Sequence, residues 1–424
     1  MSDTNCAVNK IQLQDLYKEN RDLDVQALRF RSLEKHFNEY FDNAGPLFFT
    51  SPGRIEIGGN HTDHNNGCIL ASAIDIDTAA AAKKNNLDEI NLISRDLDQK
   101  YSVSLGDLHV KPEERGTTAG LIRGVAAKLQ AEGHIIGGFD CVLESNIGIG
   151  SGLSSSASVE VLIGTILNDL YNGSLISPVE IAKYGQYAEN NYFGKPCGLM
   201  DQLAIAVGGI VFVDFFDKDN PKVEKLNFSF SDNGFETIIV NTGATHADLT
   251  DDYASIPSEM KAVSGYFGKN LCRFISRREI MDKIKELRTL YGDRAVLRAL
   301  HFLSENERVE KEVRALQDGR MEDFISLVKQ SGDSSFKFLQ NIYPNKDYKL
   351  QSITIALELT EHYLRENSSR GTCRVHGGGF AGTILTFVES ALAGNYLGLM
   401  DSILGQNSAT RVKVREYGTC RVTL

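Results

Sequence analysis

Hydrophobic and polar side chains alternate along residues 47–59, LFFTSPGRIEIGG, and this spacing predicts a strand. Ile55 and Ile57 fall on one face of it, so Arg54 points away from that face. The stretch GGFDCVLE at 137–144 predicts a second strand, which runs into a glycine-rich turn. Apolar residues then recur at helical spacing from Val159 to Leu170. This part of the chain is therefore a strand, a loop and a helix in succession.

The strand spacing and the helix spacing recur along the rest of the chain. A further helix has an explicit start, with Ser177 as N-cap, Pro178 in the first turn and Glu180 closing a capping box. Other helices are predicted at 10–44, 117–133, 258–331 and 349–365, and other strands at 208–216, 237–243 and on both sides of the glycine loop within 373–387. Strands and helices are mixed without regular βαβ units, which predicts an α+β fold.

A polar stretch at 217–234, DKDNPKVEKLNFSFSDNG, interrupts the pattern near the middle of the chain. Such a stretch is typical of a connection between domains. The sequence predicts an N-terminal domain at 1–217 and a C-terminal domain at 235–424.

The composition limits the classes of binding partner and the cellular compartment that we expect for this protein. The formal net charge of −11 over 424 residues argues against nucleic acid, which is gripped by basic patches. The seven cysteines are scattered without a C-x-x-C pair, as is typical of reduced thiols in the cytosol. There is no signal-like N-terminus and no segment long enough to cross a membrane. We expect a cytoplasmic protein that acts on small molecules.

The segment ESNIGIGSGLSSSASVEV at 144–161 is a candidate phosphate loop. Gly148, Gly150 and Gly152 let the backbone approach a ligand closely, and serines then open a helix whose positive dipole end favours anions. A flexible turn capped by serine is the alternative interpretation. The segment lacks the lysine of a Walker A loop, the G-x-G-x-x-G spacing of a Rossmann loop and the G-x-S-x-G of a hydrolase elbow.

A second polar cluster, PGRIEIGGNHTDHNNG at 52–67, leaves two interpretations open. His61, Asp63 and His64 are all metal-ligand types, so a zinc site is one. A cradle for a small hydroxylated molecule is the other, and it is favoured because no well-spaced further ligand accompanies the three.

In four places, in the same order, this sequence resembles the galactokinases of the GHMP kinase superfamily. The resemblance covers the G-R and G-x-H-T-D spacing after residue 52, GLSSSAS at 152–158, AENNYFGKPCGLMDQ at 188–202, and GGGFAG at 377–382. It implies a two-domain GHMP kinase fold, with a ribosomal-protein-S5-like N-terminal domain and a ferredoxin-like C-terminal domain. It also implies a galactokinase, which phosphorylates the anomeric O1 of α-D-galactose with ATP and Mg²⁺.

The resemblance assigns roles residue by residue. Asp201 would be the catalytic acid–base group, with Arg54 beside it. Ser156 and Glu189 would hold Mg²⁺. The sugar would be bound by Asn60, His61, Asp63, Gly198 and Tyr253. ATP would be bound by the loop residues Gly148, Gly150, Ser151, Gly152, Leu153, Ser154, Ser155 and Ser156.

The sequence departs from the family at four points. Asn60 replaces the glutamate of G-E-H, which would contact the sugar O6; Gly148 replaces a proline; Ala381 replaces a glycine; and DDYASIPSEM lacks an arginine pair. Asn60 keeps open a kinase for another galacto-configured sugar, galacturonate or N-acetylgalactosamine. A non-catalytic sugar and ATP sensor is a further alternative, although every catalytic position is filled.

Overall fold

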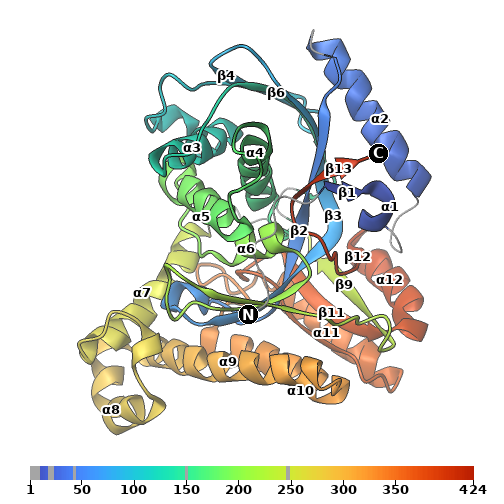
Figure 1. Cartoon of the computed structure of the whole chain (residues 1–424). Coiled ribbons are helices and arrows are strands. Elements are labelled where there is room, and N and C mark those ends of the chain that lie inside the picture. The colour runs from blue at the N-terminus through green and yellow to red at the C-terminus, as the bar shows by residue number, and fades with distance from the viewer. Residues whose placement is uncertain (1–9, 18–22, 42–43, 149–150, 245–248) are drawn as a thin grey trace.

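Two β-sheets with helices packed against them make up the computed structural model (Figure 1). It describes residues 10–17, 23–41, 44–148, 151–244 and 249–424. The expected mixture of helices and strands is present in both halves of the chain, so the α+β fold class is confirmed.

The first sheet is built around two long antiparallel strands, β2 (Leu47–Gly58) and β3 (Cys68–Lys84). Its order is β1-β13-β2-β3-β6-β4-β5, while β7 pairs with β3 and β8 with β7. The remaining strands are β1 (Lys10–Gln12), β4 (Glu89–Ser94), β5 (Gln99–Ser104), β6 (Phe139–Ser145), β7 (Ile210–Asp214), β8 (Lys222–Leu226) and β13 (Cys420–Thr423). The β2–β3 register shifts at Pro52/Gly53 and again at Glu56/Gly58, so the ladder is irregular on both sides of Arg54.

Helices cover both faces of this sheet. The alternation along β3 places Ala80 and Ala82 against one set of helices and Ala79 and Ala81 against another. The first set is α3 (Thr118–Ala131), α4 (Ser155–Tyr171), α5 (Pro178–Ala188) and α6 (Met200–Val207). On the other face lie α1 (Leu13–Leu16) and α2 (Leu23–Tyr40), which lies across the sheet from α4 in Figure 1. Helix α4 is thus held deep in the core, and its N-terminus is fixed in space.

The second sheet has four antiparallel strands in the order β10-β11-β9-β12. These are β9 (Phe235–Asn241), β10 (Thr372–Val375), β11 (Thr383–Glu389) and β12 (Ala409–Val412). One face packs on α11 (Ser352–Glu366) and α12 (Ser390–Leu404). Leu385 and Phe387 on the other face pack with side chains of α9 (Asp293–Gln317) and α10 (Met321–Ser334). The loop between β10 and β11 carries the third glycine motif and points toward the end of β2, since Gly377 O lies 2.7 Å from Asn60 Nδ2.

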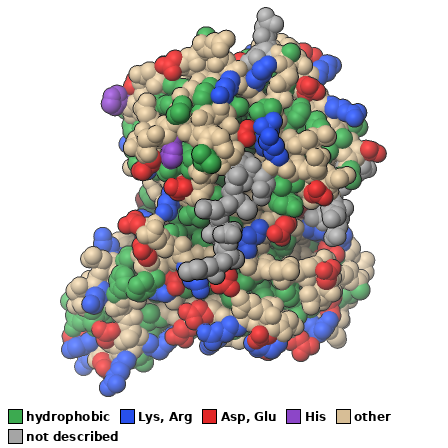
Figure 2. Space-filling view, viewed as in Figure 1, with side chains coloured by type: hydrophobic (Ala, Val, Ile, Leu, Met, Phe, Trp, Pro, Cys, Tyr) green, Lys and Arg blue, Asp and Glu red, His purple; other side chains and the backbone are tan. Residues whose placement is uncertain are grey.

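A layer of helices connects β9 to α11. Along it follow α7 (Thr250–Tyr266), α8 (Arg277–Tyr291), α9 (Asp293–Gln317) and α10 (Met321–Ser334). Two π-helical turns, Glu189–Phe193 and Ser335–Leu339, and three 3-10 turns, Asp63–Asn65, Pro112–Glu114 and Cys272–Phe274, complete the regular structure of the described residues. Figure 2 shows basic and acidic side chains interspersed along the lower edge formed by this layer.

The division into domains at 1–217 and 235–424 stays a prediction. The first sheet extends to β8, at residue 226, and the second begins with β9, at residue 235. The last strand, β13, returns to the first sheet and pairs with β1 and β2. No helix in the described part of the chain combines the length and the apolar character that crossing a membrane requires.

Candidate active site

The predicted phosphate loop leads directly into the N-terminus of α4. Gly152 has a φ of +72° and Ser154 a φ of +64°, so the backbone turns sharply twice before the helix begins at Ser155. Ser151 Oγ donates to Gly148 O at 2.6 Å and closes the loop. Gly150 lies outside the described residues. Backbone N–H groups of the loop and the dipole of a 17-residue helix therefore meet here, as anion binding requires.

The side chains of Arg54 and Asp201 form a two-point ion pair at this loop. Arg54 Nε lies 2.7 Å from Asp201 Oδ1 and Nη2 lies 2.8 Å from Oδ2. Arg54 Nη1 also donates to the carbonyl of Gly152, and Ser154 Oγ donates to Asp201 Oδ2. Strand β2 supplies the arginine and the first turn of α6 supplies the aspartate. The sequence prediction that Asp201 and Arg54 adjoin is consistent with this geometry.

The environment of Asp201 keeps its carboxylate ionised. Burial raises the pKa of Asp201, but the charge of Arg54, hydrogen bonds from Arg54 and Ser154, and the charge of Lys195 together hold it below its usual value. About a quarter of the side chain remains exposed, at 26%. An ionised, accessible carboxylate beside a phosphate loop can accept a proton from a bound hydroxyl group.

Two oxygen groups meet at the first turn of α4. Ser156 Oγ donates to Glu189 Oε1 at 3.1 Å. Glu189 is only 2% exposed, and Gln202 Nε2 donates to its second oxygen at 2.9 Å. The π-helical turn Glu189–Phe193, which follows α5, presents the glutamate at this place. A hydroxyl and a carboxylate with a fixed orientation are the ligand types that suit a hard divalent cation.

A second buried glutamate lies behind this pair. Gln202 Nε2 donates to Glu160 Oε2 as well as to Glu189, so one amide joins the two acids. Burial and the nearby charge of Glu189 raise the pKa of Glu160 well above its usual value. Both effects favour the protonated form of Glu160.

The turn after β2 places Asp63 against the segment that carries Asp201. A Cβ atom on Gly198 would overlap Oδ2 of Asp63, so glycine at 198 is what allows the carboxylate to lie there. The backbone N–H of His64 donates to Asp63 Oδ1 at 3.0 Å. The structure thus brings Asp63 and Gly198 together, as their shared assignment to the sugar site requires.

His61 extends from the same turn toward the glycine loop between β10 and β11. Its Nε2 lies 2.8 Å from the carbonyl of Gly378, so Nε2 carries the hydrogen and Nδ1 is left as an acceptor. Burial lowers the pKa of His61 to about 3, and the bond to Gly378 only partly offsets this. The side chain is therefore a neutral hydrogen-bonding group. The centroids of its ring and of the His64 ring are 6.3 Å apart, and no group of three potential metal ligands occurs among the described residues.

Tyr253 of α7 contacts the next residue of the same loop. Its hydroxyl donates to Gly379 O at 2.9 Å, and its ring lies where a Cβ on Gly378 would otherwise be. Phe380 packs edge-on against the ring, with centroids 5.3 Å apart. The structure supports a packing role of Tyr253 at the glycine loop; its expected contact with the sugar stays a prediction.

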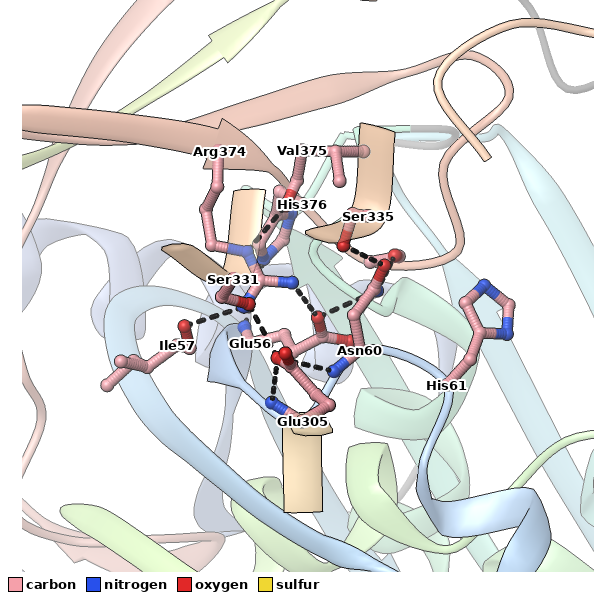
Figure 3. A network of polar contacts seen from close by, with 12 residues as sticks. Glu56, Ile57, Asn60, His61, Glu305, Ser331, Ser335, Arg374, Val375 and His376 are labelled. Atoms are coloured by element: carbon pink, nitrogen blue, oxygen red, sulfur yellow. Dashed lines mark hydrogen bonds and ion pairs between the residues drawn. The ribbon is translucent and has the colours of Figure 1, made fainter. Parts of the chain in front are cut away.

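The side chain of Asn60 lies within a polar network of the protein. The side chain is fully buried, and Figure 3 shows it turned into a polar network while His61 points away from that network. Both polar atoms of its amide already have protein partners. The expectation that Asn60 faces C6 of the sugar conflicts with this arrangement, because no hydrogen-bonding group of the side chain is left for a hydroxyl.

Sequence reasoning missed Lys195. Its Nζ lies 3.3 Å from Glu189 Oε1, and its charge contributes to the low pKa of Asp201. The side chain is 64% exposed. It was visible in the sequence as a basic residue within FGKPCG, between the predicted metal ligand and the predicted catalytic aspartate.

Comparison with known proteins places this site in a family. The model of the galactokinase galactose-binding signature matches residues 35–84, and that of the GHMP kinase N-terminal domain matches residues 120–209. The chain is 32% identical over 374 residues to the galactokinase of Mannheimia succiniciproducens, with 86% of this chain and 92% of that protein covered. The chain belongs to the galactokinase family.

Other relatives agree with this assignment. The galactokinase of Lacticaseibacillus paracasei is 30% identical over 359 residues, covering 84% of this chain and 89% of that protein. The fold is that of the Lactococcus lactis galactokinase complexed with galactose, with a TM-score of 0.79, 23% identity and coverage of 93% and 100% of the two chains. The mevalonate kinase of Methanococcus jannaschii has a TM-score of 0.61 at 17% identity, covering 87% and 98%. The family predicted from the four motifs is thereby confirmed, and with it the GHMP kinase fold.

Proposed function

We propose that this member of the galactokinase family transfers the γ-phosphoryl group of ATP to the O1 hydroxyl of α-D-galactose. The observation that carries the proposal is the Arg54–Asp201 pair, with both carboxylate oxygens held, beside the loop at Ser151–Ser156. Phosphoryl transfer needs a positioned oxygen nucleophile, a group that takes its proton, and cations that offset charge on the phosphoryl oxygens.

Each reacting atom then has a partner in the protein. O1 of the sugar attacks the γ-phosphorus, the bond from that phosphorus to the bridging oxygen breaks, and ADP leaves. The O1 proton passes to the carboxylate of Asp201, whose pKa is held low. Arg54 offsets negative charge on the carboxylate before the transfer and on the phosphoryl oxygens during it. Loop amides and the α4 dipole hold the phosphates of ATP.

The residues present fit Mg²⁺. Ser156 and Glu189 offer a hydroxyl and a carboxylate oxygen within 3.1 Å of one another, and Gln202 fixes the second carboxylate oxygen. When bound, Mg²⁺ would neutralise charge on the nucleotide phosphates. Lys195 would share Glu189 with the cation or move to a phosphate, since its side chain is exposed.

The sugar would lie against the turn after β2. Asp63 offers two carboxylate oxygens and His61 one ring nitrogen to sugar hydroxyls, while Gly198 leaves room beside them. The solved Lactococcus lactis relative is a complex with galactose, which supports the same class of substrate here. Asn60 is not part of this proposed set, because its amide is used inside the protein.

The rival substrate, galacturonate, was suggested by Asn60 alone. The amide of that side chain is hydrogen-bonded inside the protein, and no other described residue favours galacturonate or N-acetylgalactosamine. The sensor alternative predicts binding without turnover.

One experiment separates these functions. Purified protein is given Mg²⁺, ATP and one sugar from a panel of galactose, galacturonate, N-acetylgalactosamine, glucose and mannose, and ADP release is followed. Phosphorus and proton NMR then locate the phosphate on the product. We expect turnover with galactose and a phosphate on O1. Faster turnover of another sugar, or binding of galactose without ADP release, would contradict the proposal.

A further inference from the structure

The side-chain amide of Asn60 has a protein partner for every hydrogen bond it can make (Figure 3). Nδ2 donates to Glu56 Oε1 at 2.9 Å and to Gly377 O at 2.7 Å. Oδ1 accepts from Asn341 Nδ2 at 2.8 Å and from Ser335 Oγ at 3.1 Å. A primary amide has two N–H donors and two acceptor lone pairs. Nothing remains with which it could hold a ligand.

Glu56, four residues earlier on β2, is the acid that accepts from the amide of Asn60. Its Oε1 also lies 2.8 Å from Arg374 Nη2, and both side chains are buried, with exposures of 3% and 0%. Arg374 Nη1 donates to Ile57 O at 2.8 Å. The backbone N–H of Glu56 donates to His376 Nε2 at 3.0 Å. The end of β2 is thus fastened to β10 and to the residue that follows β10.

The backbone at Gly59 and Asn60 is hydrogen-bonded to the helical layer. Its carbonyl accepts from His301 Nε2 at 3.1 Å, and the N–H of Gly59 donates to Glu305 Oε1 at 3.1 Å. His301 and Glu305 both belong to α9. The turn that carries His61 and Asp63 therefore begins at a residue fixed by α9, by β2 and by the glycine loop.

The glycine loop is fixed by the same contacts. Successive carbonyls at 377, 378 and 379 accept hydrogen bonds from Asn60, from His61 and Asn341, and from Tyr253. These donors come from the end of β2, from α7 and from the segment after the second π-helical turn. Loop carbonyls left without donors in a buried place would be costly, so the donors fix the path of the loop.

We propose that Asn60 is a positioning residue that acts as one unit with Glu56, locks the sugar-binding turn at 59–63 onto the glycine loop, and makes no contact with the C6 substituent of the substrate. This rests on the proposed function, since it concerns the sugar site of that reaction. An acid at position 60 would leave Gly377 O without a donor and would bury a second carboxylate against Glu56. The hydrogen bonds of this network therefore require an amide at residue 60 when residue 56 is an acid.

The first test compares galactose with 6-deoxygalactose, which lacks only the O6 hydroxyl. For Asn60→Asp and Asn60→Leu we expect KM for both sugars to rise by a similar factor, about tenfold for one lost hydrogen bond of this kind. KM for ATP should change much less. The ratio of kcat/KM for the two sugars should stay at its wild-type value. Because both sugars are measured on one sample, this ratio does not depend on how much of the protein is folded.

Two outcomes overturn the proposal. If the ratio moves toward one in either variant, Asn60 contacts O6. If only the apparent kcat falls and both KM values stay unchanged, the residue serves folding alone. Asn233→Asp, on the exposed turn before β9, is the matched control and should alter neither KM value nor the ratio.

The second test asks whether Glu56 and Asn60 act as one unit. Asn60→Asp should lower kcat/KM for galactose less in a Glu56→Gln background than in the wild type, because the reversed pair again joins one acid to one amide. Equal losses in both backgrounds would overturn the coupling.

A third test, by hydrogen exchange, does not depend on turnover. If the wild type does not phosphorylate galactose, the proposed function is wrong. Hydrogen exchange still tests whether Asn60 holds the turn at 59–63 against the glycine loop. We expect faster amide exchange at 377–382 in Asn60→Asp than in the wild type. Unchanged exchange there would overturn the positioning role.

Discussion

The guanidinium of Arg54 holds both oxygens of Asp201, at 2.7 and 2.8 Å, although 147 positions separate the two residues in the chain. One residue comes from a strand of the central sheet and the other from the first turn of α6. A carboxylate fixed by a two-point contact keeps one orientation, so the lone pair that accepts a proton has a defined direction. This relation leads to the first prediction.

Asp201→Asn should lower kcat for galactose phosphorylation by about 10²- to 10⁴-fold, because an amide does not accept the O1 proton while its shape stays the same. Galactose and ATP should still bind, as measured by calorimetry. Asp217→Asn, on an exposed segment after β7, is the matched control and should keep wild-type rates. A variant at 201 that retained nearly full kcat would show that the proton goes elsewhere.

Ser156→Ala and Glu189→Ala should each raise the Mg²⁺ concentration needed for half-maximal rate, by at least about tenfold, since each removes a predicted metal ligand. Galactose affinity, measured by calorimetry, should change little because neither side chain adjoins Asp63 or His61. Rates at a series of Mg²⁺ concentrations check this. Metal dependence identical to that of the wild type in both variants would exclude these two residues as ligands.

Lys195→Met should change the pH dependence of the rate more than its maximum. The lysine lowers the pKa of Asp201, so its removal should move the acid limb of the kcat profile toward higher pH. At neutral pH we expect a loss of only about two- to fivefold, since the side chain is exposed. Lys183→Met, which removes a half-buried lysine of α5 that donates to the carbonyl of Asp219, is the control. An acid limb that stays in place would contradict an electrostatic role for Lys195.

Local spacing in the sequence was enough for many of the helices. The capping box of Ser177 and Glu180 is present at the start of α5. Helix α5 ends at Ala188, and the chain continues from there as a π-helical turn. No simple periodicity marks a π-helical turn, although this one places Glu189 next to Ser156.

The strand β3 was missed for a different reason. It is buried on both faces over most of its length, and polar residues alternate with apolar ones only at 74–77. Its run of four alanines at 79–82 lacks the β-branched residues that indicate a strand. The alanines fit because helices pack closely on both sides of the sheet. Tertiary packing, which a local pattern does not contain, determines this element.

The residues of the candidate site also fall into two groups, those that a local motif indicates and those whose placement depends on distant parts of the chain. The loop at 151–156 leads into the N-terminus of α4, as the strand, loop and helix pattern predicts, while its binding of ATP stays a prediction. The orientation of Asn60 depends on Gly377, 317 positions away, and on Asn341, 281 positions away. A residue-by-residue transfer from the family assigned it to the sugar because a single position shows neither of these partners.

The buried carboxyl of Glu56 gives the last prediction, which concerns stability rather than rate. Burial raises the pKa of Glu56 to about 7, although Arg374, Arg54 and the Asn60 amide favour its ionised form. The folded protein therefore binds this proton more tightly than the unfolded chain, in which the ordinary value is 4.5. The contribution of Glu56 to the free energy of unfolding is fully present below pH 4.5 and decreases as the pH rises to about 7.

Glu56→Gln removes this titration and keeps the size of the side chain. We expect the loss of stability caused by Glu56→Gln to be greatest near pH 4.5 and to shrink steadily up to about pH 7. Urea unfolding of both proteins at a series of pH values measures the difference, with Glu366→Gln, at the exposed end of α11, as the control for losing one carboxylate. A difference that stayed constant over this range, or grew with pH, would mean that Glu56 is ionised in the folded protein throughout. The Arg374 pair would then outweigh burial, and an acid at position 60 would meet a full negative charge at every pH.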